Sequence, residues 1–366
     1  MSTITFIAQF PPPIHGLSKA VDTLYHSYLN QGYKFASIDL TNNKAICKTL
    51  WNIWRSKSDL YYFTISQTLG GNWRDLLILK LLEWKHAKCL IHLHGGYYRR
   101  LVDYDCGKWQ RRLNYHAIRR LGGCIVLGKS LQSIFEGMID SKKIFTVPNC
   151  VDAQYMLSSL EAESKVKGLT EGQVVNVLYL SNFIPTKGYR EVLQLALKCK
   201  DENNMCFHFH FAGKFFEESE KIYFENYITE HDLSAYVTYH GIVTGNKKNE
   251  LLRNSHVFIL LTRYPNEGQP ISILEAMGNA MLVITTNHAG IPDIVSNKAN
   301  GLMLDKNNIN IEEIYCYLEN IRKDRNKWKA ISERNYHMVL QSYTEEQYIK
   351  SMDNVFKKML NNEKQM

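Results

Sequence analysis

Short apolar runs alternate with segments of helical pattern along this chain, and the alternation occurs in two series. Apolar runs of about 4–8 residues between helical segments are typical of parallel strands, because each crossover helix returns the chain to the same end of the sheet. The runs lie at 4–8, 61–65, 89–93, 124–127 and 144–147, and then at 174–180, 206–212, 237–240, 257–261 and 281–285. This pattern predicts an α/β fold with two Rossmann-like, doubly wound parallel-sheet domains that face a cleft.

The length of 366 residues also favours two domains, each with its own core. The stretch 152–172 is polar and rich in Ser and Glu, and we interpret it as the connection between them. We therefore expect an N-terminal domain over 1–165 and a C-terminal domain over 166–340. The pattern after Asn308 is helical, and we expect the last helix, within 341–366, to pack back on the N-terminal domain.

Composition excludes several classes of protein. Hydrophobic residues make up 45% of the chain and charged residues 22%, which indicates a folded globular protein. No apolar run approaches the roughly 20 residues that span a bilayer, and the first residues lack the pattern of a secretory signal. The eight cysteines are scattered without the spacing of a zinc site. We expect a cytoplasmic protein with reduced thiols.

Positive charge is concentrated in the first half. The net charge is +8, and the segment from Arg74 to Lys143 alone has 14 Lys and Arg against 6 Asp and Glu. Such an excess suits nucleic acid, an anionic lipid surface or a phosphorylated substrate, and the charge alone does not choose among them. A solvated basic surface without a partner is the simplest alternative.

A predicted helix over 108–121 carries part of this charge. Its apolar residues recur at helical spacing, which favours packing of that stripe against a core; they are Trp109, Leu113, Ala117 and Leu121. Contact with an anionic membrane surface is the alternative, and the basic residues that would make it are Arg111, Arg112, Arg119 and Arg120.

The loop after the first strand is a candidate anion site. It contains three consecutive prolines and then Gly16 at the start of a predicted helix. Glycine lets backbone amides approach a ligand closely, and free amides at a helix N-terminus attract phosphate. The loop matches neither the G-x-G-x-x-G nor the P-loop pattern, so it favours neither a dinucleotide nor a nucleoside triphosphate. A rigid proline turn is the structural alternative.

Histidine pairs occur on two predicted strands. His92 and His94 share one face of a strand that ends at Gly95-Gly96, which leaves His94 as a loop histidine or as a group that positions a substrate. No carboxylate or cysteine lies at ligand spacing in the same loop, which disfavours zinc. His208 and His210 alternate with phenylalanines, and we interpret them as structural. The Asp103-x-Asp105 pattern follows a basic segment, and we interpret it as a solvated loop.

The second series begins with a strand followed by Lys187-Gly188 at a predicted strand-to-helix turn. A lysine at this place can neutralise a diphosphate, and the developing charge on that group is the main obstacle to expelling a nucleotide.

Two carboxylates flank another helix start, in the stretch Asn266 to Met277 after the apolar run 257–261. Pro270 suits the first turn of a helix, where its missing N–H has no role. Glu267 then lies in the loop and Glu275 about 7.5 Å along the helix axis. Each carboxylate can accept charge-assisted hydrogen bonds from hydroxyl groups of a sugar or a ribose. The alternative is that both acids only complement the helix dipole.

Together these segments resemble the retaining family 4 glycosyltransferases of the GT-B fold, over nearly the whole chain. The most specific motifs are the Glu-x₇-Glu element from Glu267 to Glu275, the segment 289–295 and Asn300-Gly301-Leu302. The segments 11–18 and 94–95 resemble bacterial members that build O-antigens and capsules. The segment 148–152 matches the family's P-N-G-V-D pattern with Cys150 in place of glycine.

The resemblance implies a role for each matched position. Gly16 would let the first loop approach the donor phosphate or the acceptor, and His94 would lie beside the donor sugar. Lys187 would bind the diphosphate, Glu267 the sugar hydroxyls and Glu275 the ribose. The rest of the donor site would comprise Gly268, Gln269, Pro270 and Ile271 through backbone amides, and Ile242 and Val243 around the base. Asn182 stands where many members have an arginine, which makes Lys187 more heavily responsible for the diphosphate.

The implied reaction is retaining transfer of a sugar from a nucleotide diphosphate donor, a UDP-sugar in preference to a GDP-sugar, to a lipid-linked saccharide. The resemblance implies no cofactor, no metal and no nucleic acid. It places the protein at the inner face of the plasma membrane, in contact with an anionic surface. Domain closure over the donor is a further expectation. A sugar-nucleotide epimerase or hydrolase on the same fold is one alternative, and a basic nucleic-acid-binding protein is another.

Overall fold

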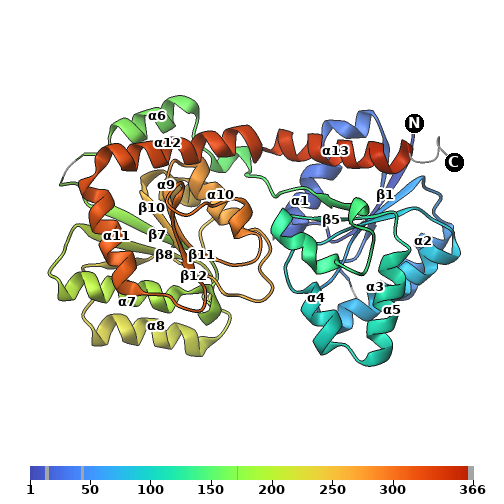
Figure 1. The fold of residues 1–366 in the computed structure, drawn as a ribbon, viewed down its shortest axis with the longest axis horizontal. Helices are drawn as coiled ribbons and strands as arrows, with labels where there is room; N and C mark the ends of the chain where they lie inside the picture. The colour runs from blue at the N-terminus through green and yellow to red at the C-terminus, as the bar shows by residue number, and fades with distance from the viewer. Residues whose placement is uncertain (13–15, 43–44, 171, 362–366) are drawn as a thin grey trace. The chain divides into compact units, whose positions relative to one another are not determined.

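The computed structural model describes residues 1–12, 16–42, 45–170 and 172–361. These residues form two compact units (Figure 1). Unit 1 comprises Met1–Cys150, Pro265–Gln269 and Glu345–Met366, and unit 2 comprises Val151–Tyr264 and Pro270–Thr344. Unit 1 is therefore built from three separate segments of the chain.

Unit 1 contains a parallel sheet of six strands in the order β2-β1-β3-β4-β5-β6. The central strand β3 is buried along its whole length, as expected for a parallel strand covered on both faces. The strands are β1 (Thr3–Ala8), β2 (Lys34–Asp39), β3 (Leu60–Thr64), β4 (Cys89–His92), β5 (Gly123–Val126) and β6 (Ile144–Thr146).

Helices from both ends of the chain cover this sheet. Helix α13 (Glu345–Asn361) packs with α1 (Gly16–Tyr25) and β1 in one core, where Phe356 contacts the rings of Phe6 and Tyr62. Helix α3 packs against both α2 and α5. The bounds of these helices are α2 (Ile46–Arg55), α3 (Leu69–Trp84) and α5 (Lys108–Arg119), and a short helix α4 (Tyr98–Arg100) precedes α5.

Unit 2 contains a second parallel sheet of six strands, in the order β12-β11-β10-β7-β8-β9. Strand β10 is fully buried, and it is followed by the loop that leads to α10. The strands are β7 (Val175–Leu180), β8 (Phe207–Ala212), β9 (Val237–Tyr239), β10 (Val257–Leu260), β11 (Leu282–Asn287) and β12 (Gly301–Asp305). The helices are α6 (Ser159–Lys167), α7 (Tyr189–Asp201), α8 (Glu218–Glu230), α9 (Gly245–Asn254), α10 (Ile271–Gly278), α11 (Ile311–Lys323) and α12 (Arg325–Ser342).

The predicted fold class is confirmed, since each unit has a six-stranded parallel sheet with flanking helices. The pattern of apolar runs did not predict two of the strands. Both are edge strands, β2 and β12, and β2 is mostly exposed, so it lacks the continuous apolar run of a central strand. The units divide at Cys150–Val151, ahead of the expected position 165, because α6 packs on α12 of unit 2. Helix α6 begins with a capping box formed by Ser158 and Glu161.

The expected burial of the apolar stripe is confirmed for Leu121, which follows α5 and is 5% exposed, but it is wrong for the first two residues of the stripe. Trp109 is 76% exposed and Leu113 is 46% exposed, whereas Gln110 and Asn114 are buried. The two amides are buried because they hydrogen-bond with Asn72 on α3, so polar groups fill the contact between the helices.

The interpretation of Asp103-x-Asp105 as a solvated loop is also wrong. Residues Leu101–Asp105 form a turn of π-helix, and Asp103 forms ion pairs with Arg99 at 2.8 Å and Arg111 at 3.1 Å. No helix in the described part of the chain is both long and apolar enough to cross a membrane.

Candidate functional site

The loop after β4 and the loop after β10 lie together in unit 1. A Cβ atom on Gly268 would lie 2.5 Å from the carbonyl oxygen of His94, and one on Gly95 would lie 2.8 Å from the carbonyl oxygen of Asn266. Both glycines are therefore needed for the close approach of two backbones. The structure thus places His94 next to the segment that carries Glu267, and Glu267 is 7% exposed.

Gln269 fixes this segment to the end of the first sheet. Its side-chain oxygen accepts from the backbone N–H of Asn149 at 2.8 Å, and the Asn149 side chain donates to its carbonyl oxygen at 2.8 Å. The Gln269 amide also donates to the carbonyl of Leu127 at 3.2 Å. Gln269, Asn149 and Leu127 are all buried. The Gln269 side chain therefore has a structural role that the sequence did not indicate. The partner Asn149 belongs to the segment 148–152 that the sequence singled out.

His92 supports His94 from within the sheet. The two rings have centroids 3.9 Å apart, and His92 Nδ1 is 2.7 Å from the hydroxyl of Tyr62. Burial, with the neighbouring His94 as the second cause, holds the pKa of His92 well below its usual value, so this ring is neutral. His94 is only half-buried, which leaves it the more accessible of the pair. Across the residues that the structure describes, no three His, Cys, Asp or Glu side chains are grouped as metal ligands.

The first loop of unit 1 is described only in part. Gly16 is exposed and is the first residue of α1, which agrees with a helix start after β1. The preceding Pro13, Ile14 and His15 lie outside the described residues.

Lys187 in unit 2 lies where the loop after β7 contacts the end of β10. It closes a 3₁₀ turn, Pro185–Lys187, and is followed by Gly188 with φ 84°. A Cβ atom on Gly188 would lie 2.4 Å from the carbonyl oxygen of Leu261, at the end of β10. The ammonium of Lys187 is 4.8 Å from the centroid of the Tyr264 ring, a cation–π contact. The loops after β7 and β10 are therefore in direct contact.

Arg263 is a second cation at this junction, and no sequence motif indicated it. Its backbone N–H donates to the carbonyl of Thr186 at 2.7 Å, and its guanidinium donates to Glu191 on α7 at 2.6 Å. The backbone carbonyl of Asn182, in the loop after β7, accepts from the hydroxyl of Tyr179 at 2.9 Å. A basic residue two positions after the buried run 257–261 was the available signal, because ligands bind at carboxyl ends of parallel strands.

Glu275 is buried inside unit 2 and has a cationic partner. Lys248 on α9 lies 2.7 Å from its carboxylate, and the same ammonium is 4.1 Å from the centroid of the Tyr155 ring. Burial raises the pKa of Glu275, and the charge of Lys248 opposes that rise. Pro270 is the N-cap of α10 and the helix begins at Ile271, so Glu275 is in its second turn. The sequence did not reveal Lys248 as the partner, since that contact joins two separate helices.

The segment proposed to surround the base follows β9. Gly241 has φ 68°, and its carbonyl accepts from the N–H of Gly213 at the end of β8. Ile242 is 67% exposed and Val243 is half-buried. An exposed aliphatic side chain beside a strand end is available to a planar ligand.

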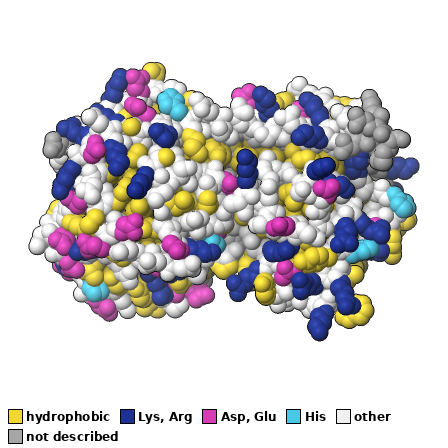
Figure 2. All heavy atoms as spheres, viewed as in Figure 1, with side chains coloured by type: hydrophobic (Ala, Val, Ile, Leu, Met, Phe, Trp, Pro, Cys, Tyr) yellow, Lys and Arg dark blue, Asp and Glu magenta, His cyan; other side chains and the backbone are white. Residues whose placement is uncertain are grey.

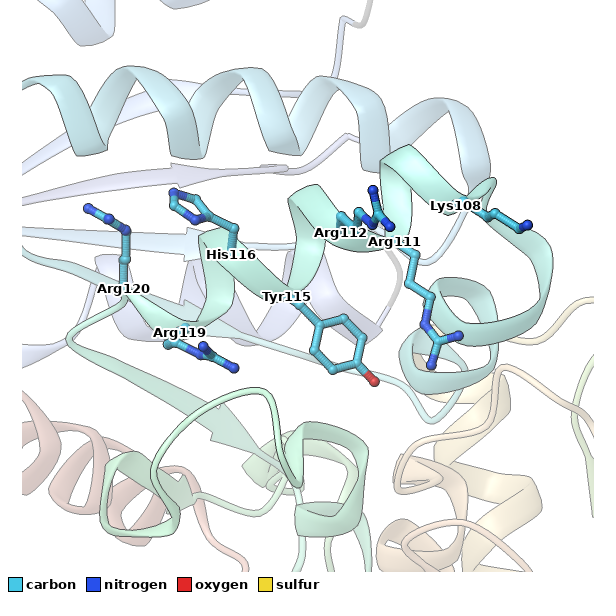
Figure 3. Close-up of a pocket in the computed structure, with 7 residues that line it drawn as sticks. All are labelled: Lys108, Arg111, Arg112, Tyr115, His116, Arg119 and Arg120. Carbon is cyan, nitrogen blue, oxygen red and sulfur yellow. The ribbon is translucent and has the colours of Figure 1, made fainter.

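The basic residues of α5 line a surface pocket on unit 1 (Figure 3). Arg111 pairs with Asp103, and Arg120 pairs with Glu83 at 2.9 Å. The other basic or aromatic side chains that line it are Lys108, Arg112, Tyr115, His116 and Arg119.

Residues 161–338 match the model of the family "Glycosyl transferases group 1". The matched segment includes Lys187, Arg263 and Glu275 and covers a little less than half of the chain. No curated protein sequence matches the chain.

Solved structures with a similar fold include HepE, a sucrose-phosphate synthase and WaaG. HepE from Anabaena, in complex with UDP, superposes with a TM-score of 0.75 at 14% identity, over 97% of this chain and 100% of that one. HepE has also been solved in complex with UDP-glucose. Sucrose-phosphate synthase from Thermosynechococcus elongatus gives 0.75 at 12% identity, over 99% and 100%. WaaG, a glycosyltransferase involved in lipopolysaccharide biosynthesis, gives 0.63 at 12% identity, over 96% and 99%. These likenesses show the GT-B fold, in which each of two domains is Rossmann-like.

Proposed function

We propose that this chain moves a sugar from a nucleotide diphosphate to a lipid-linked saccharide with retention of configuration. The premise is that the chain is a transferase with a group 1 glycosyl transferase domain in residues 161–338. The donor is a UDP-sugar in preference to a GDP-sugar. The observation that carries the proposal is the junction of the loops after β7 and β10, which holds Lys187 and Arg263 at the carboxyl edge of the second sheet.

The charge at this junction matches the departing group of such a reaction. A nucleotide diphosphate leaves with negative charge, and fixed cations at that position lower the barrier. Lys187 supplies one cation. Arg263 supplies the second, which offsets the loss of the arginine that Asn182 replaces. The proposal assigns the diphosphate to these two side chains and requires no metal ion.

The other donor groups lie in the loop before α10, in α10 itself and in the segment after β9. Glu275 binds the ribose hydroxyls, and its ion pair with Lys248 favours the charged form that accepts their hydrogen bonds. Ile242 and Val243 surround the base, and the backbone amides of Gly268 to Ile271 line the donor site. Glu267 binds the sugar hydroxyls, and the close approach of His94 to Gly268 in unit 1 supports a shared role with His94.

We assign no protein nucleophile to this reaction. The acceptor hydroxyl attacks on the face from which the diphosphate leaves, and the leaving phosphate accepts its proton. The contribution of the protein is to position both groups and to stabilise the departing charge. Glu267 is therefore a donor-binding residue and not half of a two-carboxylate pair.

The positive charge of unit 1 supports the proposed acceptor and the proposed cellular location. The basic face of α5 suits a lipid-linked acceptor at the inner face of the plasma membrane, in the synthesis of bacterial O-antigen or capsule. The fold likeness to WaaG, which is involved in lipopolysaccharide biosynthesis, supports a role of this kind. The complexes of HepE with UDP and UDP-glucose support the uridine base.

A thermal-shift panel of UDP-sugars and GDP-sugars tests the donor, because a ligand of the native state raises the unfolding temperature. We expect a shift with UDP-sugars that Lys187→Ala abolishes and that Lys221→Ala, a control on exposed α8, retains. In a transfer assay, loss of one such electrostatic group lowers kcat by about 10²–10³-fold. A panel without any shift would contradict donor binding. A rearranged or hydrolysed nucleotide sugar without an acceptor product would instead identify an epimerase or a hydrolase.

A further inference from the structure

Tryptophan is distributed very unevenly over this molecule. The chain has six tryptophans, and five of them are exposed on three helices of unit 1. Their exposed fractions are 59% for Trp51, 55% for Trp54, 48% for Trp73, 66% for Trp84 and 76% for Trp109, whereas Trp328 in unit 2 is buried. Tryptophan normally buries most of its area, so five exposed copies on one group of helices require a physical reason.

These tryptophans form stripes on helices that touch. On α3 the outward stripe has spacing i, i+4, i+7, i+11 and comprises Trp73, Leu77, Lys80 and Trp84. On α5 the same spacing gives Trp109, Leu113, His116 and Arg120. Helix α2 adds Trp51 and Trp54, and α3 packs against both of the other helices. We call the five tryptophans with Leu77 and Leu113 the tryptophan face.

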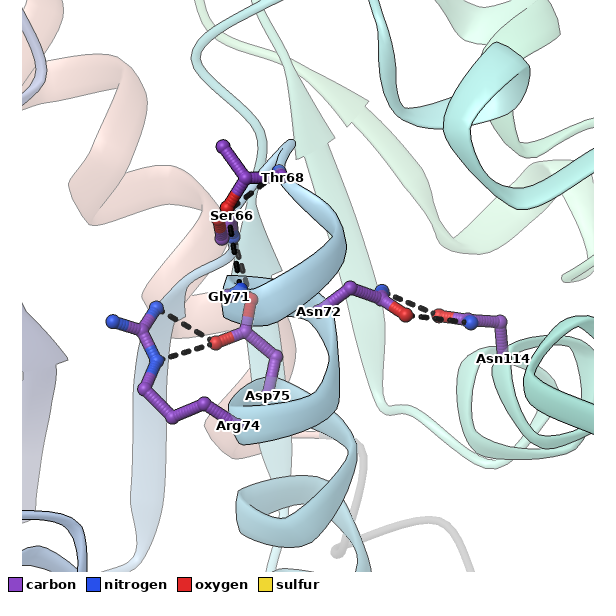
Figure 4. Close-up of polar contacts among 7 residues, drawn as sticks. All are labelled: Ser66, Thr68, Gly71, Asn72, Arg74, Asp75 and Asn114. Atoms are coloured by element: carbon purple, nitrogen blue, oxygen red, sulfur yellow. Dashed lines mark hydrogen bonds and ion pairs between the residues drawn. The ribbon is translucent and has the colours of Figure 1, made fainter. Parts of the chain in front are cut away.

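The buried sides of α3 and α5 explain why the rings point outward. Asn72 on α3 donates to Asn114 on α5 at 2.8 Å, and its oxygen accepts from Asn114 at 2.9 Å and Gln110 at 2.8 Å (Figure 4). Tyr98 also donates to Asn114 at 2.8 Å. Rotation of either helix to bury its tryptophans would leave these amides without partners, at about 1–3 kcal/mol for each unsatisfied group. The hydrogen bonds of the buried amides therefore keep the tryptophans of both helices on the exposed side.

The same helices carry a strong excess of positive charge. Their two carboxylates are already neutralised: Asp75 is buried beside Arg74, and Glu83 contacts Lys80, His116 and Arg120. Two cations lie close to exposed rings, Lys80 at 5.8 Å from Trp84 and Arg112 at 5.7 Å from Trp109. Figure 2 shows Lys and Arg side chains in dark blue beside hydrophobic ones in yellow over the part of unit 1 where α3 and α5 lie. The exposed cations are Lys48, Arg55, Lys80, Lys108, Arg111, Arg112, Arg119 and Arg120.

We propose that the tryptophan face is the surface by which this protein lies on an anionic lipid bilayer, with its indole rings at the level of the headgroups. Tryptophan favours the interface of membrane and water, and each Lys or Arg near an anionic surface adds about 1 kcal/mol. This inference extends the proposed lipid-linked acceptor by assigning the bilayer contact to named residues on α2, α3 and α5. The exposed leucines favour lipid over single-stranded nucleic acid, because an aliphatic side chain offers no ring on which a base stacks.

The test uses the whole protein without donor or acceptor, so that it is independent of sugar transfer. The probe is vesicles of phosphatidylethanolamine with phosphatidylglycerol, compared with vesicles of phosphatidylcholine alone. We expect cosedimentation and a blue shift of tryptophan emission only with the anionic vesicles, and quenching of that emission by lipids brominated near the headgroup. Salt should weaken the binding, since exposed charges are screened.

Two pairs of variants separate the contributions of rings and charge. The triple variant Trp73→Ala, Trp84→Ala, Trp109→Ala should bind vesicles at least tenfold more weakly, and its control is Phe216→Ala with Ile222→Ala, two exposed apolar residues of unit 2. Arg112→Gln with Arg119→Gln should weaken binding by about tenfold or more, and its control is Lys327→Gln with Arg334→Gln in unit 2. Circular dichroism verifies that each variant is folded.

The outcomes distinguish this inference from the proposed function. Vesicle binding that needs the tryptophans supports the face even if no nucleotide sugar binds, and in that case only the proposed function fails. Equal binding to both kinds of vesicle, or no effect of the triple variant, overturns the inference. Emission changes that require an oligonucleotide, or that accompany dimerisation in the absence of vesicles, also overturn it and assign the face to nucleic acid or to a second copy.

Discussion

The position of Lys187 depends on its glycine neighbour. Gly188 has φ 84° and no room for a Cβ, which would lie 2.4 Å from the carbonyl oxygen of Leu261. The Lys-Gly pair of the sequence is thus one structural unit, in which the glycine permits the strand ends to meet and the lysine occupies the junction. The family pattern indicated the lysine, and the contact with Leu261 gives the reason for the glycine.

Gly188→Ala should therefore damage both stability and donor binding. We expect a loss of more than about 2 kcal/mol in the free energy of unfolding, because backbone strain and a steric clash act together. The affinity for a UDP-sugar should fall at least tenfold. Gly137→Ala is the control, since φ is 72° there but nothing lies within 4 Å of the added Cβ. Its free energy of unfolding, measured by chemical denaturation, should fall by only about 1 kcal/mol. Its affinity for a UDP-sugar, measured by titration calorimetry, should not change. Equal losses in both variants would contradict the role of Leu261.

Asp75 should give unit 1 a dependence of stability on pH. Burial raises its pKa from 3.8 to about 6, although Arg74 and the N–H of Ser66 oppose the rise. The folded state therefore binds the proton more tightly than the unfolded state. This contribution is fully present below pH 3.8 and is lost as the pH rises through about 6.

Asp75→Asn removes that titration. Across this pH window the variant should gain about 2–3 kcal/mol in unfolding free energy relative to the wild type, as measured by urea denaturation at several pH values. Glu83→Gln is a control of opposite sign, because hydrogen bonding to Lys80 lowers the pKa of Glu83. A constant difference between wild type and Asp75→Asn over the window would show that Asp75 does not titrate there.

At the scale of elements, α3 and α5 reverse the usual polarity of a helix pair. Their contact is a network of amides, and their exposed stripes carry tryptophan and leucine. The sequence period correctly indicated this helix but wrongly assigned Trp109 and Leu113 to the core. A period reports which residues share a face, whereas hydrogen-bond partners on another helix decide which face is buried.

This reversal predicts unequal effects for two adjacent residues. Asn114→Ala should reduce the free energy of unfolding by about 2–3 kcal/mol, because it leaves groups of Asn72 and Tyr98 buried without a partner. Leu113→Ala, at a position 46% exposed, should change it by less than about 0.5 kcal/mol. Equilibrium unfolding in urea measures both. A larger effect at Leu113 would place the core on the opposite side of α5.

At the scale of the whole molecule, the last helix belongs to the unit formed by the first residues of the chain. Unit 2 ends at Thr344, and α13 then packs in the core of unit 1. Phe356 is fully buried there, with ring contacts to Phe6, Tyr33 and Tyr62. The stability of unit 1 therefore depends on residues that follow unit 2 in the sequence.

Phe356→Ala should destabilise unit 1 by about 3–5 kcal/mol. Hydrogen exchange should show faster exchange in β1 and β3 and unchanged exchange in β7 and β10. Phe224→Ala is the reciprocal variant, since Phe224 is buried in the core of unit 2. Its effect should fall on β7 and β10 instead. Equal loss of protection in both sheets from either variant would mean that the units unfold as one.

The sequence by itself determined the fold class and where the candidate donor-site residues stand along the strands and helices. Strand and helix periods reflect local burial, and Gly16, His94, Lys187, Glu267 and Glu275 stood at predicted strand ends or helix starts, where ligands of parallel sheets bind. Only the tertiary structure brought His94 to the loop of Glu267, Arg263 to Lys187 and Lys248 to Glu275. It also decided that α5 buries amides and exposes tryptophan. Each of these contacts joins segments far apart in sequence, and no local period carries information about a distant partner.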